Sequence, residues 1–167
     1  ASLSAGDDIQ VTANYGTDVD VNAYGGSGSI GVGLGAQVAV VTDNSSQSAY
    51  AQAGTSAADS VKILKADAVS FSASADRHID VEAKGLAVGS VAAGVAIGVV
   101  TVGGVTDAFL GQYTQVGQTA AAVGSVSVSA DNALTVDQDI WSVSGGIGLA
   151  VSVNIASVDY SSKVRGY

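Results

Sequence analysis

The chain of 167 residues contains no cysteine, proline or methionine. Without cysteine it has no disulfide scaffold, no thiolate metal site and no thiol nucleophile. Only 13% of its residues are charged, and its six Lys and Arg are too few for the positive cluster that nucleic acid binding needs. The net charge of −9 also disfavours contact with anionic membranes. This acidity suits an extracellular protein and leaves divalent cations as conceivable ligands.

Glycine and small apolar residues dominate the sequence instead. There are 22 glycines, and 47% of the residues are hydrophobic, mostly Ala and Val. Ordinary loops use both Gly and Pro, so many glycines without proline indicate regular, closely stacked backbone. The interior is therefore expected to be thin and filled by small side chains. Residues 1–5 have neither a basic residue nor an apolar segment, so they do not resemble a signal peptide.

Three charge-free apolar runs, Val21–Thr42, Gly85–Thr106 and Ile140–Val158, recur at near-regular spacing. The first two copies, offset by 59 or 60 residues, match at Val11 and Phe71, Val19 and Ile79, and Val40 and Val99. A looser third copy, offset by 56 or 57, places Val136 under Ile79, Ile155 under Val99 and Val164 under Ala108. A fixed period of this length is typical of solenoids and other repeat arrays. The sequence thus predicts one elongated solenoid domain, 1–167, with three divergent repeats of about 56–60 residues near 7–64, 65–124 and 125–167.

The apolar runs are interpreted as strands. Gly85–Val105 is long enough to cross a bilayer as a helix. However, Ile30–Ala36 and Ile147–Ile155 alternate large with small or polar residues, as strands do. An all-β fold follows, and each repeat divides into three coils of about 20 residues, close to one turn of a parallel β-helix. Stacked rows of small residues would narrow the interior or present a flat outer face able to pack against another copy.

Several short polar or glycine-containing segments are predicted to be turns. They are Asn14–Gly16, Gly25–Gly26, Asp43–Asn44, Gly103–Gly104, Asp131–Asn132 and Gly145–Gly146. The segment Gln52–Lys65 lacks alternation and is predicted to be a loop, in which Ser56 or Asp59 could cap a short helical turn.

Paired carboxylates are the candidate metal ligands. Residues two apart on a strand project to the same side, so such a pair could share a hard cation such as calcium. The pairs are Asp18 with Asp20, Asp80 with Glu82, and Asp137 with Asp139, which would form an acidic column if the copies stack. The calcium-binding Gly-Gly-x-Gly-x-Asp nonapeptide is absent, and a solvated acidic face is the competing interpretation. No other cofactor is expected.

The sequence gives little support to catalysis. His78, the only histidine, lies beside Arg77 on a strand whose alternation points His78, Asp80 and Glu82 outward. One histidine without cysteine supports no familiar triad and no zinc site. The aromatic residues are scattered, and the matching positions of Tyr50 and Phe109 suggest stacking between copies rather than a sugar-binding platform. The chain is predicted not to be an enzyme.

The apolar repeat resembles a known family. Gly89–Thr101 followed by Thr106–Gly111 is similar to a unit of filamentous-haemagglutinin-like and leukotoxin-type filamentous adhesins, which are large bacterial surface exoproteins. The same pattern recurs at Gly33–Ala51 and more faintly at Gly146–Gly166. The resemblance implies a right-handed parallel β-helix, secretion across the outer membrane, and a stalk or adhesive surface.

The leading functional hypothesis is a non-enzymatic extracellular or cell-surface protein. It would be a β-helical stalk segment or a self-assembling filament subunit, with further copies of itself, a longer chain, or a surface glycan or protein as partner. One alternative is a pore-forming assembly that inserts the apolar runs into a membrane. The other is a carbohydrate-active β-helix, in which His78 or Arg77 would be needed for activity.

Overall fold

The computed structural model describes residues 1–118 and 122–167, and there the protein is all-β, as predicted. The described part holds no helix, and hence none that could span a bilayer. The strands are β1 (Ser2–Ser4), β2 (Ile9–Gly28), β3 (Val32–Asp43), β4 (Gln47–Ala51), β5 (Lys62–Val102), β6 (Val105–Leu110), β7 (Gln115–Val116), β8 (Val123–Tyr160) and β9 (Lys163–Gly166).

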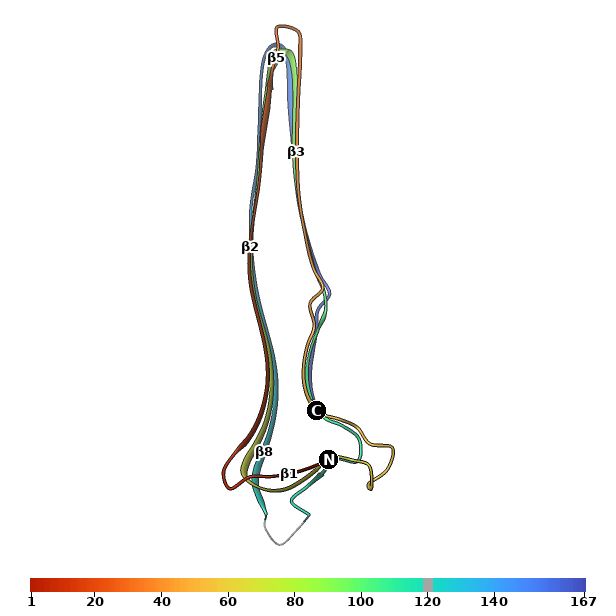
Figure 1. The fold of residues 1–167 in the computed structure, drawn as a ribbon. Helices are drawn as coiled ribbons and strands as arrows, with labels where there is room; N and C mark the ends of the chain where they lie inside the picture. The colour runs from red at the N-terminus through yellow and green to blue at the C-terminus, as the bar shows by residue number, and fades with distance from the viewer. Residues whose placement is uncertain (119–121) are drawn as a thin grey trace.

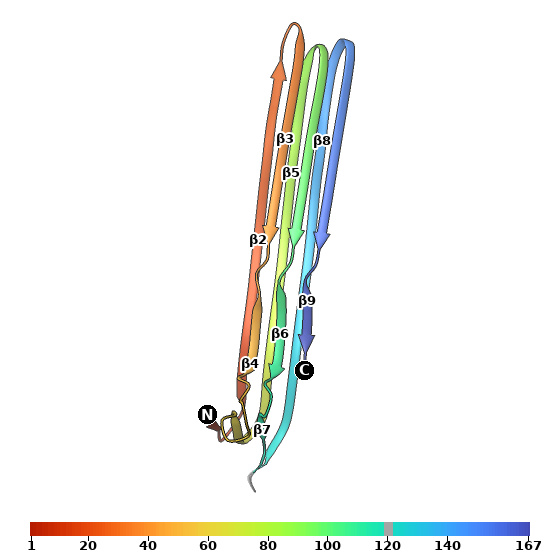
Figure 2. The ribbon, with the colours of Figure 1, turned by 90° about the vertical axis from the view of Figure 1, so that its right-hand side faces the viewer.

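The long strands form two facing layers joined at one end of the molecule (Figure 1). The chain runs out along one layer, reverses at an apex and returns along the other, and it does so three times side by side (Figure 2). We call these passages the first rung (β2 to β4), the second rung (β5 and β6) and the third rung (β8 and β9). The outgoing arm comprises residues 9–28, 69–88 and 126–145, and the returning arm comprises 32–43, 91–102 and 149–160.

All strand pairs in both arms are parallel. In the outgoing arm β2 pairs with β5 from Ile9–Val69 to Gly28–Val88, and in the returning arm β3 pairs with β5 from Val32–Val91 to Asp43–Val102. One step between neighbouring rungs therefore takes 59 or 60 residues here. The expected division of each repeat into three coils of about 20 residues is wrong, because one repeat forms a single long rung with two extended arms.

The register of the third rung also differs from the sequence alignment. Ile79 pairs with Val136 as aligned, but Val99 pairs with Ser157 and Ala108 with Gly166. A register shift between Gly89 and Val91 contributes to this difference. A slip of two residues keeps each side chain on the same face of a strand, so the apolar pattern alone could not detect it.

The core lies between the two arms and is built from small side chains. Ile79 and Val81 of the outgoing arm pack with Ala96 and Val100 of the returning arm, and all four side chains are fully buried. A second cluster around Phe71 fills the wider end. At Gly98 an added Cβ would lie 2.5 Å from the Ile140 Cδ1 atom, so a larger residue there would force the Ile140 side chain to shift. The thin interior expected from composition is therefore present.

The turn predictions are partly right. Asp43–Asn44 and Gly103–Gly104 mark the ends of the returning strands, and Gly145–Gly146 lies at the apex, within β8. Asn14–Gly16 and Asp131–Asn132, in contrast, lie inside β2 and β8, as does Gly25–Gly26 inside β2. The predicted loop is also confirmed over residues 52–61, where the Thr55 hydroxyl donates to Asp59 at 2.5 Å, whereas β5 already begins at Lys62.

Candidate assembly surfaces

The outer side of the outgoing arm carries all six carboxylates predicted as metal ligands, and we call it the acidic face. His78 and Asp80 are exposed there while Ile79 and Val81 are buried, which confirms the predicted alternation. The parallel register brings Asp20, Asp80 and Asp137 next to one another in one row, and it pairs Glu82 with Asp139 in another. The sixth predicted ligand, Asp18, pairs with His78 instead.

Several of these carboxylates already have partners within the chain. Lys84 forms ion pairs with Glu82 and, at 3.0 Å, with Asp139, and the Tyr24 hydroxyl donates to Glu82. The Asn22 side chain donates to Asp20 at 2.6 Å. Among residues 1–118 and 122–167, no three His, Asp or Glu side chains are grouped closely enough to hold a metal ion. Lys84 thus places a positive charge beside Glu82 and Asp139, two of the predicted ligands.

His78 and Arg77 lie on opposite sides of the sheet. His78 is exposed at a shallow hollow of about 410 Å³ that is also lined by Asp18 and Asp76. Arg77 is 1% exposed and faces the interior. The carbohydrate-active alternative considered His78 and Arg77 together. Because they face opposite sides of the sheet, the two side chains cannot serve one surface site.

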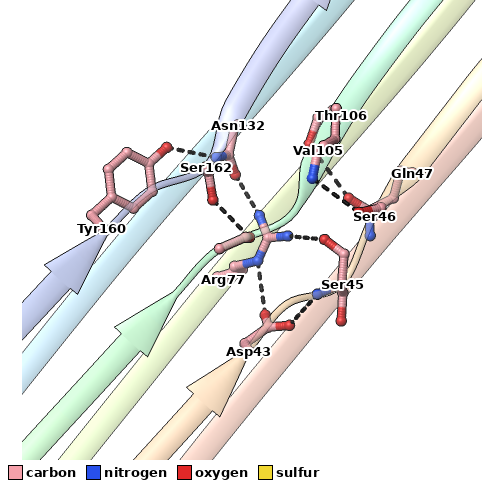
Figure 3. A network of polar contacts seen from close by, with 11 residues as sticks. Asp43, Ser45, Ser46, Gln47, Arg77, Val105, Thr106, Asn132, Tyr160 and Ser162 are labelled. Atoms are coloured by element: carbon pink, nitrogen blue, oxygen red, sulfur yellow. Dashed lines mark hydrogen bonds and ion pairs between the residues drawn. The ribbon is translucent and has the colours of Figure 1, made fainter.

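Arg77 is the centre of a buried polar network that sequence reasoning missed (Figure 3). Its Nε donates to Asp43 at 2.8 Å and its Nη2 to the Ser45 carbonyl at 3.0 Å, both in the first rung. Its Nη1 donates to Asn132 of the third rung at 2.6 Å. The guanidinium also lies over the Tyr15 ring, 5.3 Å from its centroid. One side chain of the middle rung therefore connects all three rungs.

The Asp43 carboxylate is held in its charged form by this network. Burial acts to raise its pKa, but the hydrogen bonds from Ser45 and the hydrogen bond and charge of Arg77 together outweigh that effect and hold the pKa below its ordinary value. The Ser45 backbone N–H donates to the other carboxylate oxygen at 2.9 Å. Both charges of the pair are therefore satisfied despite their burial.

A stack of aromatic rings runs across the rungs below the returning arm. Tyr50 and Phe109 are stacked with ring centroids 5.0 Å apart, which confirms the predicted stacking. Tyr167 continues the stack at 5.3 Å from Phe109. Beside it, Arg165 forms a bidentate ion pair with Asp107 at 2.8 and 2.7 Å, which raises the pKa of Arg165. These contacts fix β4, β6 and β9 in register.

The outer side of the returning arm is aliphatic, and we call it the aliphatic face. It consists of three rows of outward residues, namely Val32, Leu34, Ala36, Val38, Val40 and Thr42; Val91, Ala93, Val95, Ile97, Val99 and Thr101; and Leu149, Val151, Val153, Ile155, Ser157 and Asp159. Leu34 is 68% exposed, Val38 57% and Leu149 60%. Asp159 is the only charged residue among these positions, and it lies at one end.

In the part of this arm nearest the apex, large residues face outward because the inner side has no room for them. A Cβ added at Gly33 would lie 2.4 Å from the Val88 carbonyl oxygen, and one at Gly35 would lie 2.8 Å from that of Leu86. These are backbone atoms, which cannot move aside cheaply. The alternation of large and small residues was correctly interpreted as a strand, but here the small residues form the inner side and the large ones face solvent.

The chain is thus an all-β protein in which long parallel strands stack rung upon rung between an acidic face and an aliphatic face. Comparison with models of protein families, with curated proteins and with solved structures finds no match to it.

Proposed function

We propose that the chain is a non-enzymatic structural or adhesive protein of the extracellular bacterial surface, whose role is to extend along the direction in which its rungs stack. In this proposal the three rungs are part of a right-handed parallel β-helix, with the handedness taken from the adhesin resemblance. Further rungs come from a longer chain or from other copies, so the chain acts as a stalk segment or a filament subunit.

The observation that carries the proposal is the contrast in burial between the middle rung and the outer rungs. At one inward position of the returning arm, Val100 of the middle rung is fully buried, whereas its partner Val158 in the third rung is 50% exposed. At the next inward position, Val102 is buried and Tyr160 is 49% exposed. The inner face of a rung is therefore complete only when another rung covers each side of it, as in repeat arrays generally.

The open side of the first rung supports the same argument. A hollow of about 570 Å³ lies there, lined by Tyr15, Val19, Val21 and Asp43 among others. Within the described residues, β2 and β3 form ladders only with β5, so their other backbone edges have no strand partner. Unpaired edges of long strands readily pair with another strand. A fourth rung would fill the hollow and pair these edges at once.

The acidic face is the surface that such a stack would leave toward solvent. Its rows of carboxylates would lengthen with each added rung, and a calcium ion or a surface glycan or protein could then contact several rungs together. The pairing of Asp20, Asp80 and Asp137 in one row supports this part of the proposal.

Negative-stain electron microscopy of the purified chain, without detergent, tests the proposal. We expect rods or filaments in the images. X-ray fibre diffraction of the same sample should show the strand spacing of about 4.8 Å along their length. Val158→Glu places a charge on the uncovered inner position of the third rung, so it should prevent added rungs from stacking there. Thr135→Glu, an equal charge change at an exposed position of the acidic face, should not.

Three outcomes would count against the proposal. Globular particles in the wild type and in Thr135→Glu would contradict axial stacking. Equal rod lengths in Val158→Glu and Thr135→Glu would show that the open inner face is not the contact. Particles that remain dispersed only in detergent would favour the membrane-inserting alternative. The same images with calcium and with a chelator decide whether the carboxylate rows take part.

A further inference from the structure

We infer that the aliphatic face is a lateral interface on which a second copy of the chain packs with the same face. This inference rests on the proposed structural role, but it concerns a different surface from the rung edges and predicts contacts at right angles to the stacking direction.

The outward orientation of the large residues on the aliphatic face follows from the fold. These large side chains point away from the core, and toward the apex the core side of the same strands is filled by Gly33, Gly35, Ala92 and Ala96. Solvent exposure of aliphatic residues in three consecutive rungs gives a contiguous apolar surface of the kind that marks interaction sites. Such a surface on a monomer would otherwise favour nonspecific aggregation.

The shape and size of the face suit a sheet-on-sheet contact. In the edge-on view the three returning strands lie behind one another, so the face is nearly flat (Figure 1). Three strands about 4.8 Å apart, with eleven residues each at about 3.3 Å rise, give a footprint of roughly 500 Å². Two such faces together bury on the order of 1,000 Å², which reaches the lower limit for a specific interface. Each rung added by axial stacking would enlarge it.

Charge distribution favours a second copy over a lipid surface. The face itself carries no Lys or Arg, and the net charge of the chain is −9, so anionic membranes would repel it. The aromatic residues near the apex, Tyr24 and Trp141, lie on the outgoing arm, where they could not anchor this face in a bilayer interface. Pairing through the aliphatic faces places the two acidic faces on opposite outer sides, separated by four sheet layers. With layers about 10 Å apart, that distance exceeds the Debye length of about 8 Å.

Sedimentation velocity of the full chain over a concentration series tests the interface. The wild type is expected to form a species of twice the chain mass. Val38→Glu introduces one charge halfway along the first-rung strand of the face, and Thr12→Glu introduces the same charge on the exposed side of the other arm. We expect Val38→Glu to weaken lateral association about tenfold or more, because the buried carboxylate would have no partner, and Thr12→Glu to leave it unchanged.

The Val158→Glu variant separates this inference from axial stacking. Lateral dimers that persist in Val158→Glu and are lost in Val38→Glu support the inference. Oligomers that are lost in Val158→Glu but equal in Val38→Glu and Thr12→Glu overturn it while leaving axial stacking intact. A monomeric wild type that floats with phosphatidylcholine vesicles, and ceases to do so in Val38→Glu, would also overturn it and make lipid the occupant.

A second measurement covers the case in which Val38→Glu does not fold, which circular dichroism would reveal. Because the chain has no cysteine, Val38→Cys and Thr12→Cys each provide a single thiol. We expect alkylation of Cys at position 38 by a maleimide to slow as protein concentration rises, with no such change at position 12. Equal reaction rates at both positions across the series would refute the interface.

Discussion

Neutralising Asp43 tests whether the buried network holds the rungs together. Asp43→Asn leaves the Arg77 guanidinium, 1% exposed, without the carboxylate that lies 2.8 Å from its Nε. Breaking a buried ion pair on one side typically costs 3–5 kcal/mol, because an uncompensated charge remains in the interior. Asparagine keeps an oxygen that can accept a hydrogen bond, so we expect a loss near the lower limit, about 3 kcal/mol of unfolding free energy.

Urea unfolding followed by circular dichroism measures this loss, and a double-mutant cycle identifies its cause. Arg77→Met in the Asp43→Asn background removes the stranded charge, so the double variant should be more stable than Asp43→Asn alone. Asp107→Asn is the matched control: it removes the same charge from an ion pair whose partner, Arg165, is half exposed, and its effect should be much smaller. A loss below about 0.5 kcal/mol for Asp43→Asn, or additive effects in the cycle, would refute the reasoning.

Three further predictions concern pH, backbone approach and ring stacking. The pKa of Asp43 is lowered in the folded state, so its stabilisation is complete above the unfolded value of about 4 and disappears as pH falls through the folded value. The stability difference between wild type and Asp43→Asn should therefore shrink below about pH 4 in an unfolding series; an unchanged difference would contradict the pKa shift. Gly33→Ala should cost about 1–3 kcal/mol in thermal unfolding, because its Cβ would meet the Val88 backbone, whereas Gly145→Ala, with no atom within 4 Å, should be nearly neutral. Phe109→Ala removes two ring stacks and should cost about 3 kcal/mol, with Phe109→Tyr close to wild type in the same assay; equal losses for both would exclude stacking as the cause.

Alternation was sufficient to predict strands but not to predict which side of each strand is the core. In the outgoing arm the polar residues identify the solvent side, so Ile79 could be placed inside and His78 outside from sequence alone. In the returning arm only Asp43 on the inner side and Asp159 on the outer side are charged, and both lie at one end, so size is the main difference between the two sets. The core there accepts Gly33 and rejects Leu34, because the arms approach too closely for a larger side chain. Only the three-dimensional distance between the layers decides which set of residues faces the core.

The length of a rung could not be predicted because polar residues inside a strand resemble turns. Asn14 and Gly16 suggested a chain reversal, yet they continue β2 without interruption. Asn14 accepts a hydrogen bond at 2.9 Å from Ser74, its partner in the next rung. Stacking thus gives a polar residue a cross-rung partner, and that contact forms only between residues 60 apart in the sequence.

The buried network could have been partly predicted. The alternation that places Ile79 inside also places Arg77 inside, two residues earlier on the same strand. What the pattern could not supply is its counter-charge, because Asp43 comes from the end of β3, 34 residues away. For the carboxylates proposed as metal ligands, the repeat correctly aligned Asp20, Asp80 and Asp137 as neighbours. The ion pairs of Lys84 could not be predicted, because they depend on side-chain geometry that no spacing encodes.

The two proposed contact surfaces act in different directions and depend on different parts of the repeat. Axial stacking uses backbone edges and the inner faces of rungs, where positions such as Gly33 and Gly35 have no room for a larger side chain. Lateral pairing uses outward aliphatic side chains, whose identity can vary as long as they remain apolar, as it does among Val38, Ile97 and Ile155, which lie side by side on the three rungs. If both contacts form, the aliphatic face is covered and the inner faces are completed by further rungs. The acidic face, with His78 and the carboxylate rows, then remains as the principal surface that the assembly presents to its surroundings, so an adhesive contact with a ligand or a cation would have to be made there.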